Sequence, residues 1–419
     1  MRIASLLLAA VLGLAASLAG AAFYDASFER KPTPADLTAL GRRLFSEPAL
    51  SASGRMSCAS CHSPAHAYGP PNARAVQLGG ADLKSPGLRA VPSLRYRAFT
   101  PAFDLHFRDA DGNDSTDQGP AGGFGWDGRA GSAHEQAAGP LLSPFEMANA
   151  SAAQVVARLR TSPSAGAFKA TFGPHALDDE ARAWKGLLWA LEVFQQDPAE
   201  FAPFSSKYDA VLRGQARLTA AEQRGLSAFN DAGRGNCAAC HTSGAGRNGS
   251  PLFTDFGLIN LGLPRNPRIA ANTDPAFFDL GLAGPLRQDL AADHELCGRF
   301  KAPSLRNVAT RSVFFHNGVF TRLDEAVRFY AERDHRPERY YGRSRQPNDL
   351  PPNCRAAINA EPPFGHASKP AFSEAEVQDI VAFLRTLTDG FTRLPAPVPP
   401  QPSARAQPAT GRPAVASPP

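Results

Sequence analysis

The chain has 419 residues, which is enough for two domains of ordinary size. Its 44 basic and 39 acidic residues are spread along the sequence and leave a formal net charge of +5. Because no basic run stands out, the charge pattern predicts no nucleic-acid-binding surface.

The first 22 residues have the features of a secretory signal peptide. Arg2 precedes an apolar run from Ile3 to Leu18, and the small residues Ala19-Gly20-Ala21 fit the cleavage rule. We therefore predict that residues 1–22 are removed on export, with an uncleaved anchor as the alternative. No later stretch is apolar for long enough to cross a bilayer, so no membrane span is expected after signal cleavage.

The first predicted helix begins at Thr33-Pro34 and leads through a loop into Cys58-Ala-Ser-Cys61-His62. This spacing is the attachment signature of c-type haem. The two thiols bond to the haem vinyl groups and the adjacent imidazole reaches the iron. A redox C-x-x-C pair that happens to precede histidine is the alternative.

The same order of helix, loop and motif returns in the second half of the chain. Thr219-Ala-Ala-Glu222 has the form of a helix capping box, and a glycine-bearing loop then leads to Cys237-Ala-Ala-Cys240-His241. The repetition predicts two homologous haem domains, residues 23–212 and residues 213–393.

Two complete motifs in one exported chain with six cysteines set the redox alternative aside. We predict two covalently attached c-type haems, with His62 and His241 as their proximal ligands. Haem attachment and export together indicate a bacterial periplasm. In that oxidising compartment the two remaining cysteines, Cys297 and Cys354, could form a disulfide, which the sequence leaves open.

The predicted fold class is mainly α: two cytochrome c-like haem domains with long loops rich in proline and glycine. Further helices are expected near residues 151–160 and 179–196, and Ser373-Glu-Ala-Glu376 caps a last helix that is expected to end at Asp389-Gly390. Residues 394–419 are rich in proline and alanine and are predicted to form a disordered tail.

The ligand on the far side of the second haem is constrained by the methionine count. The three methionines are Met1, Met56 and Met147, so the second haem cannot take a thioether ligand from its own domain. Thr321 with Asp324 has the pattern of a helix cap, and the following apolar face carries Tyr330 inward. By periodicity alone, a core tyrosine is the alternative.

The runs Phe300-Lys-Ala-Pro-Ser-Leu-Arg-Asn307 and Phe315-His-Asn-Gly318 resemble the bacterial dihaem cytochrome c peroxidase superfamily. In its peroxidases, a methionine fourteen residues after that histidine ligates the second haem. Fourteen residues after His316 is Tyr330. Tyrosine at this position is typical of the MauG-type branch, so the resemblance implies that Tyr330 is a metal ligand.

The resemblance also implies catalytic residues near the first haem. At the superfamily's spacing, Gln136, Pro140 and Glu146 match its distal glutamine, proline and glutamate, and Trp126 matches the tryptophan between the haems. Glu146 would then be the general acid–base in peroxide cleavage, Gln136 its helper and Trp126 an electron relay. The alternatives are ordinary loop polar residues and a core tryptophan packed on a haem edge.

Several positions depart from the superfamily pattern. Leu78 stands sixteen residues after His62, where resting peroxidases carry a blocking histidine, so the first haem is expected to be five-coordinate. His66 is expected at the surface or beside a propionate. Gly235 stands where the type member acting on methylamine dehydrogenase has a surface tryptophan, which disfavours that partner.

The superfamily usually holds a calcium ion between its domains. Ala90, Arg311 and Val313 stand where an asparagine and a Thr-x-Pro stretch would supply ligands, so calcium is doubtful here. The acidic insertion at residues 109–117 lacks a closing glutamate and is predicted to be a solvated loop.

That insertion, with residues 140–149 and 329–334, resembles the MbnH-type members, which use peroxide to oxidise a tryptophan on a small copper-binding partner. The expected function is therefore a periplasmic enzyme that uses hydrogen peroxide to oxidise a residue, with tryptophan as a candidate, on a partner protein. The first alternative is a cytochrome c peroxidase that takes electrons from a small cytochrome. The second is a dihaem electron-transfer cytochrome without catalysis.

Overall fold

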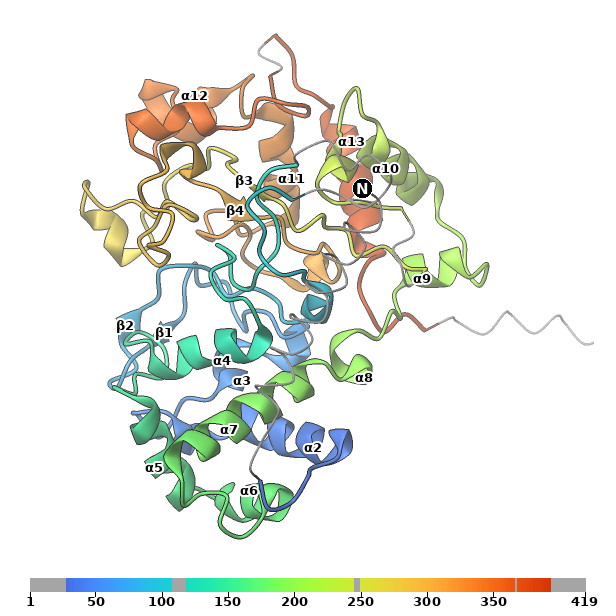
Figure 1. Ribbon diagram of the computed structural model, residues 1–419. Helices are drawn as coiled ribbons and strands as arrows, with labels where there is room; N and C mark the ends of the chain where they lie inside the picture. Colours follow the sequence, from blue (N-terminus) through green and yellow to red (C-terminus); the bar gives the residue numbers. More distant parts are fainter. Residues whose placement is uncertain (1–27, 108–117, 245–248, 366–367, 393–419) are drawn as a thin grey trace, which may run out of the picture.

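The computed structural model describes residues 28–107, 118–244, 249–365 and 368–392. The predicted signal peptide, the acidic insertion and the proline-rich tail lie outside the described residues. The fold is mainly helical, as predicted (Figure 1). The helices of the first half are α2 (Pro34–Phe45), α3 (Cys58–Cys61), α4 (Ala133–Leu142), α5 (Ala152–Thr161), α6 (Ala165–Phe172), α7 (Glu180–Gln195), α8 (Pro198–Phe201) and α9 (Lys207–Leu212).

The second half contributes fewer helices and longer loops. Its helices are α10 (Ala220–Asn230), α11 (Leu323–Glu332), α12 (Pro337–Tyr341) and α13 (Glu374–Arg385). The strands form two short antiparallel pairs: β1 (Leu78–Gly79) with β2 (Ser85–Pro86), and β3 (Leu258–Ile259) with β4 (Phe300–Lys301).

The buried side chains form two large hydrophobic cores. The N-terminal core takes its residues from Leu37 to Phe201 and lies among α2, α4, α5, α6 and α7, in the lower part of Figure 1. The C-terminal core takes its residues from Tyr208 to Leu387 and lies among α10, α11 and α13, in the upper part. The chain passes from the N-terminal core to the C-terminal core between Phe201 and Tyr208. The domain boundary between residues 212 and 213 stays a prediction.

The helix before each haem motif packs in the same way against a later helix of the same half. A Cβ atom added to Gly41 of α2 would lie 2.0 Å from the Ala190 carbonyl oxygen in α7. At Gly225 of α10, the corresponding distance to the Asp379 oxygen in α13 is 1.9 Å. Both contacts require glycine because any side chain would overlap the facing backbone. The sequence repeat is thus also a repeat of helix packing.

We expect Gly225→Ala to lower the free energy of unfolding by about 1–3 kcal/mol because the added methyl group would force α10 and α13 apart. Gly166→Ala is the matched control: a Cβ atom there meets no atom within 4 Å, and alanine favours the helix. Urea unfolding of the holoprotein followed by circular dichroism measures both. Equal midpoints for the two variants would contradict the proposed close contact.

Several predicted helix boundaries are confirmed. Thr219 and Ser373 each cap their helix with the hydroxyl, and the glutamate three residues later bonds back to the cap. The helices expected near residues 151–160 and 179–196 are α5 and α7, each within about one residue of the predicted ends.

Two predicted helix ends are wrong. Thr321 does not cap α11: the cap residue is Arg322, and the Asp324 carboxylate accepts hydrogen bonds from Arg322 and Arg328 instead. α13 ends at Arg385 rather than at Asp389, and Asp389 lies beyond the helix, where it accepts a 2.7 Å hydrogen bond from the Tyr96 hydroxyl of the other half.

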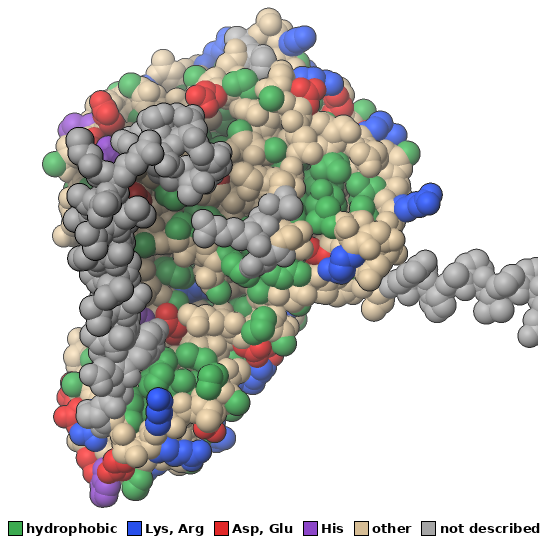
Figure 2. All heavy atoms as spheres, turned by 45° about the vertical axis from the view of Figure 1, so that its right-hand side comes forward, with side chains coloured by type: hydrophobic (Ala, Val, Ile, Leu, Met, Phe, Trp, Pro, Cys, Tyr) green, Lys and Arg blue, Asp and Glu red, His purple; other side chains and the backbone are tan. Residues whose placement is uncertain are grey.

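The two halves are also joined by the segment at residues 118–130, which runs alongside β3 and β4 (Figure 1). Leu258 N donates to Pro120 O over 2.8 Å, and Lys301 N donates to Trp126 O over 2.8 Å. Trp126 is therefore placed at the junction of the two halves. On the face shown in Figure 2, acidic and basic side chains of the described residues are interspersed.

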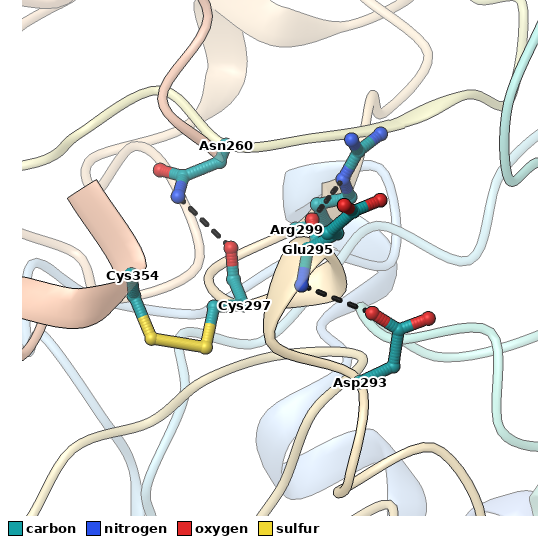
Figure 3. Close-up of a disulfide and its surroundings, with 6 residues drawn as sticks. All are labelled: Asn260, Asp293, Glu295, Cys297, Arg299 and Cys354. Carbon is teal, nitrogen blue, oxygen red and sulfur yellow. Dashed lines mark hydrogen bonds between the residues drawn. A yellow bond between two sulfur atoms is a disulfide. The ribbon is translucent and has the colours of Figure 1, made fainter. Parts of the chain in front are cut away.

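Cys297 and Cys354 form a disulfide, which settles the pairing that the sequence left open (Figure 3). The Asn260 side-chain amide donates a 2.9 Å hydrogen bond to the Cys297 carbonyl and ties this region to the loop after β3. Among the helices that the structure describes, none has both the length and the apolar character needed to cross a membrane.

Candidate functional site

One continuous cavity runs between the two halves and brings both haem motifs together. Its lining includes Cys61 and His62 of the first motif and Cys237, Cys240 and His241 of the second. It also includes the residues that the resemblance selected: Trp126, Gln136, Pro140, Glu146 and Tyr330. The remaining motif cysteine, Cys58, packs against the N-terminal core.

The first motif is held by one helical turn, α3. The Nδ1–H group of His62 donates to the Tyr68 carbonyl oxygen over 3.0 Å, which leaves Nε2 as the free lone-pair nitrogen. Burial lowers the pKa of His62 to about 4, so the imidazole is neutral at physiological pH. A neutral imidazole oriented in this way is suited to bind a metal ion.

The second motif repeats this arrangement. His241 donates its Nδ1–H group to the Phe253 carbonyl over 3.0 Å, and burial lowers its pKa. Burial also raises the pKa of the Cys237 and Cys240 thiols to about 12. The residues at both motifs therefore fit a c-type haem: two thiols for the vinyl groups and one oriented imidazole for the iron.

The distal glutamine is oriented by an arginine from another loop. Gln136 and Pro140 lie one turn apart on α4, on the side that faces the cavity. Arg97 donates to Gln136 Oε1 over 2.8 Å and to Gln195 Oε1 over 3.0 Å. Because the carbonyl end of Gln136 is held, its amide N–H groups are left for a ligand in the cavity.

Glu146 lies in the turn that follows α4. Its backbone N–H donates to Ser143 O, and its carbonyl accepts a 2.8 Å hydrogen bond from Gly80 N next to β1. Burial raises the pKa of the Glu146 carboxyl. Its negative charge in turn contributes to the raised pKa of Cys61, which places the carboxylate beside the first haem motif.

Position 78 carries no imidazole. Leu78 begins β1 and lines the cavity near the first motif. His66, the other histidine that follows the first motif closely, does not line the cavity and has its Nδ1 within 3.0 Å of the Ser63 hydroxyl.

Trp126 is held from two sides. Its indole N–H donates a 2.7 Å hydrogen bond to the Ala90 carbonyl, and its own carbonyl accepts from Lys301 N. Ala90 N in turn donates to His316 O over 2.7 Å. The indole is buried and lines the same cavity as both proximal histidines.

Tyr330 faces the cavity from α11, together with Leu323, Ala326 and Val327 of the predicted apolar face. Its ring stacks on Phe364, with centroids 5.5 Å apart. Burial raises the pKa of its hydroxyl, and Tyr330 packs against the same C-terminal core as Cys237 and Ala238 of the second motif. Tyr330 is therefore close to the second motif, about ninety residues away in sequence.

Sequence reasoning assigned no role to three basic side chains that line the cavity: Arg97, Arg311 and His316. The buried Nη2 of Arg97 and Nε2 of His316 have no hydrogen-bond partner among the described residues. The Arg97 guanidinium, with its Nη2 unpartnered in this cavity, fits a haem propionate, whereas burial lowers the pKa of His316 to about 3 and leaves a neutral imidazole. Arg97 begins a 3₁₀ turn and Arg311 directly follows another, and these elements are too short for periodicity to select either residue. His316 was visible only through the resemblance.

The fold and the site define a c-type protein with two haem attachment sites on one shared cavity. Residues 35–217 match the family model of di-haem cytochrome c peroxidase. The chain is 40% identical over 371 residues to the methylamine utilization protein MauG of Paracoccus denitrificans, covering 86% of this chain and 90% of that protein. The chain therefore belongs to the dihaem cytochrome c peroxidase/MauG family, and it is a haem peroxidase.

Other relatives agree with this assignment. The diheme peroxidase BthA of Burkholderia thailandensis has a TM-score of 0.76 and 40% identity, with 86% of this chain and 87% of that chain covered. A MauG-like protein associated with microbial copper homeostasis has a TM-score of 0.60 and 26% identity, with 87% and 94% covered. Cytochrome c551 peroxidase of Nitrosomonas europaea is 27% identical, over 85% of this chain and 81% of that protein. Membership of the MbnH-type branch stays a prediction. The chain is 40% identical to MauG and to BthA, but 26% identical to the MauG-like protein associated with copper homeostasis.

Proposed function

We propose that this protein is a periplasmic MauG-like enzyme that uses hydrogen peroxide to oxidise a residue, such as tryptophan, on a partner protein. The observation that carries the proposal is Tyr330, which lies in the cavity beside the second motif of a chain with no methionine after Met147. The periplasm is supported by the predicted signal at residues 1–22, by haem attachment and by the Cys297–Cys354 disulfide.

The proposed chemistry begins at the first motif, where Glu146 and Gln136 face the cavity. When bound, the haem iron supplies the electrons and the coordination site that O–O cleavage requires. Glu146 takes the proton from the inner peroxide oxygen and delivers it to the outer oxygen, which leaves as water. Gln136 orients the peroxide through amide N–H groups that Arg97 leaves free.

Trp126 then carries one oxidising equivalent between the two sites. Its indole is buried at the junction of the two halves and cannot shift easily, because its N–H and its carbonyl are both hydrogen bonded. An aromatic ring held in this position suits electron transfer between the sites without itself binding a substrate.

At the second motif, His241 and Tyr330 are the residues that would hold the iron of the second haem. A phenolate is a hard, anionic donor, whereas a thioether is soft and raises the reduction potential. A bound metal cation would also favour the phenolate, against the effect of burial on the hydroxyl. The tyrosine ligand therefore favours retention of an oxidising equivalent over acceptance of electrons from a donor cytochrome.

A cytochrome c peroxidase that takes electrons from a small cytochrome is the second candidate, because such peroxidases are among the relatives. Leu78 at the position of the blocking histidine and the lack of a methionine near the second motif argue against it. Membership of a peroxidase family argues against a dihaem cytochrome without catalysis.

The absorption spectrum of the ferric holoprotein, recorded before and after one equivalent of peroxide without reductant, tests the proposal. We expect immediate conversion to a state that lasts for seconds or longer. No reaction until one haem has been reduced would contradict the proposal and identify a reductively activated cytochrome c peroxidase.

A further inference from the structure

A short loop at residues 90–94 supports both the tryptophan and the first proximal histidine. Ala90 accepts the Trp126 indole N–H, as described above. At the other end of the loop, Leu94 N donates to Tyr68 O over 3.3 Å, and this same carbonyl holds the His62 imidazole. Any group that holds this loop therefore bears on both residues.

Arg311 holds the loop from the other half of the molecule. It follows directly after the 3₁₀ turn Val308–Thr310, which packs on α13. Its Nη2 donates to the Val91 carbonyl over 3.0 Å, and its Nε donates to the Val313 carbonyl over 3.1 Å. One guanidinium thus joins carbonyl groups from segments 220 residues apart in sequence.

The charge on Arg311 is not matched by a carboxylate within 4.0 Å among the described residues. Burial lowers its pKa to about 10, so the side chain stays positive at physiological pH. Its partners in the structure are carbonyl dipoles, which are also the groups that a bound metal cation would use.

The residues do not fit the calcium ion that the family resemblance implies at this place. Calcium takes six to eight oxygen ligands. Position 90 is an alanine without a side-chain oxygen, and the carbonyls of Val91 and Val313 are already bound to a positive group. No group of three or more His, Cys, Asp or Glu side chains that could hold a metal occurs in the part of the chain that the structure describes.

We infer that Arg311 is a built-in cation that replaces calcium at the junction of the two halves. It ties the loop at residues 90–94 to residues 311–313 and so positions Trp126 and His62. The inference goes beyond the proposed function and holds for either peroxidase mechanism. With Arg311 in this role, the protein needs no calcium ion for its haem geometry or its stability.

The first test uses the unaltered holoprotein. We expect dialysis against EGTA to leave the ferric absorption spectrum and the thermal unfolding midpoint unchanged, and added calcium to change neither. Metal content, measured by plasma mass spectrometry, identifies any ion that EGTA removes. A calcium ion whose removal changes the haem spectrum would overturn the inference.

The second test compares Arg311→Gln with Arg268→Gln. Arg268 also binds carbonyls, those of Gly318 and Val319, but its contacts stay within the second half. We expect both variants to unfold at a lower temperature, but only Arg311→Gln to shift the ferric haem spectrum, since only that variant frees the loop at residues 90–94. Arg311→Lys, which keeps the charge, should restore part of the spectrum. If Arg311→Gln has the wild-type spectrum, Arg311 does not position this loop.

Discussion

We expect Glu146→Gln to slow the reaction of the ferric protein with hydrogen peroxide by about 10²–10⁴-fold, the range typical of the loss of a general acid–base. The amide has nearly the shape of the carboxylate but cannot accept the peroxide proton. Haem attachment should be unaffected because Glu146 lies outside both motifs. Stopped-flow absorption with excess peroxide measures the rate constant.

The matched control is Glu135→Gln. Glu135 is an exposed residue on α4, the helix that precedes Glu146, and its carboxylate accepts a hydrogen bond from the backbone N–H of Gly131. Its replacement should leave the rate constant within about twofold of the wild type, since surface changes of this kind have small effects. A wild-type rate in Glu146→Gln would remove the residue from the mechanism.

The pH dependence follows from the direction of the Glu146 pKa. The carboxylate must be ionised to accept a proton, and burial raises its pKa. The wild-type rate constant should therefore fall as the pH is lowered through that raised pKa, above the usual range of a glutamate. In Glu146→Gln this limb of the pH profile should be absent. A limb at the same pH in the variant would assign the titration to another group.

Tyr330→Phe should abolish the long-lived state that peroxide produces, while both haems stay attached. The change removes a single oxygen atom from a side chain that otherwise keeps its packing against Phe364. Tyr330→Met should instead raise the reduction potential of the second haem because thioether is the softer ligand. Absorption and paramagnetic resonance spectra with and without peroxide, together with a redox titration, measure these effects.

The control for this pair is Tyr340→Phe. Tyr340 lies in the same aromatic cluster, but its hydroxyl is directed to Glu332 and it does not line the cavity. We expect it to retain the wild-type response to peroxide. If Tyr330→Phe also retains the response, Tyr330 is a core tyrosine and the MauG-like mechanism loses its main support.

Much of the local structure was predictable. The haem motifs depend on the spacing of five consecutive residues, and the capping boxes at Thr219 and Ser373 on the spacing of four. The exception is Thr321, where the same kind of pattern failed. Asp324 is drawn to two arginines, and one of them, Arg328, is a turn away on the helix. Ion pairing with nearby arginines thus takes the carboxylate that the capping pattern would have used.

The residues of the candidate site were predicted mainly from the resemblance to the dihaem peroxidase superfamily, and less from periodicity or residue spacing alone. In the structure, one cavity is lined by Trp126, Gln136, Pro140, Glu146 and Tyr330. From the sequence, each of them taken alone could equally be an ordinary core or loop residue. Their catalytic and ligand roles stay predictions until the variants are measured.

The sequence by itself determined what depends on neighbours along the chain: the two haem attachment motifs, the helices at α5 and α7, the capping boxes at Thr219 and Ser373, and the absence of a methionine for the second haem. Only the tertiary structure decided what depends on partners far apart in sequence. Arg97 orients Gln136, the Ala90 carbonyl holds Trp126, and Arg311 reaches Val91. The last two contacts end on backbone carbonyls of an irregular loop, and such carbonyls have no sequence code. Their positions follow only when both cores have formed and brought the loops together.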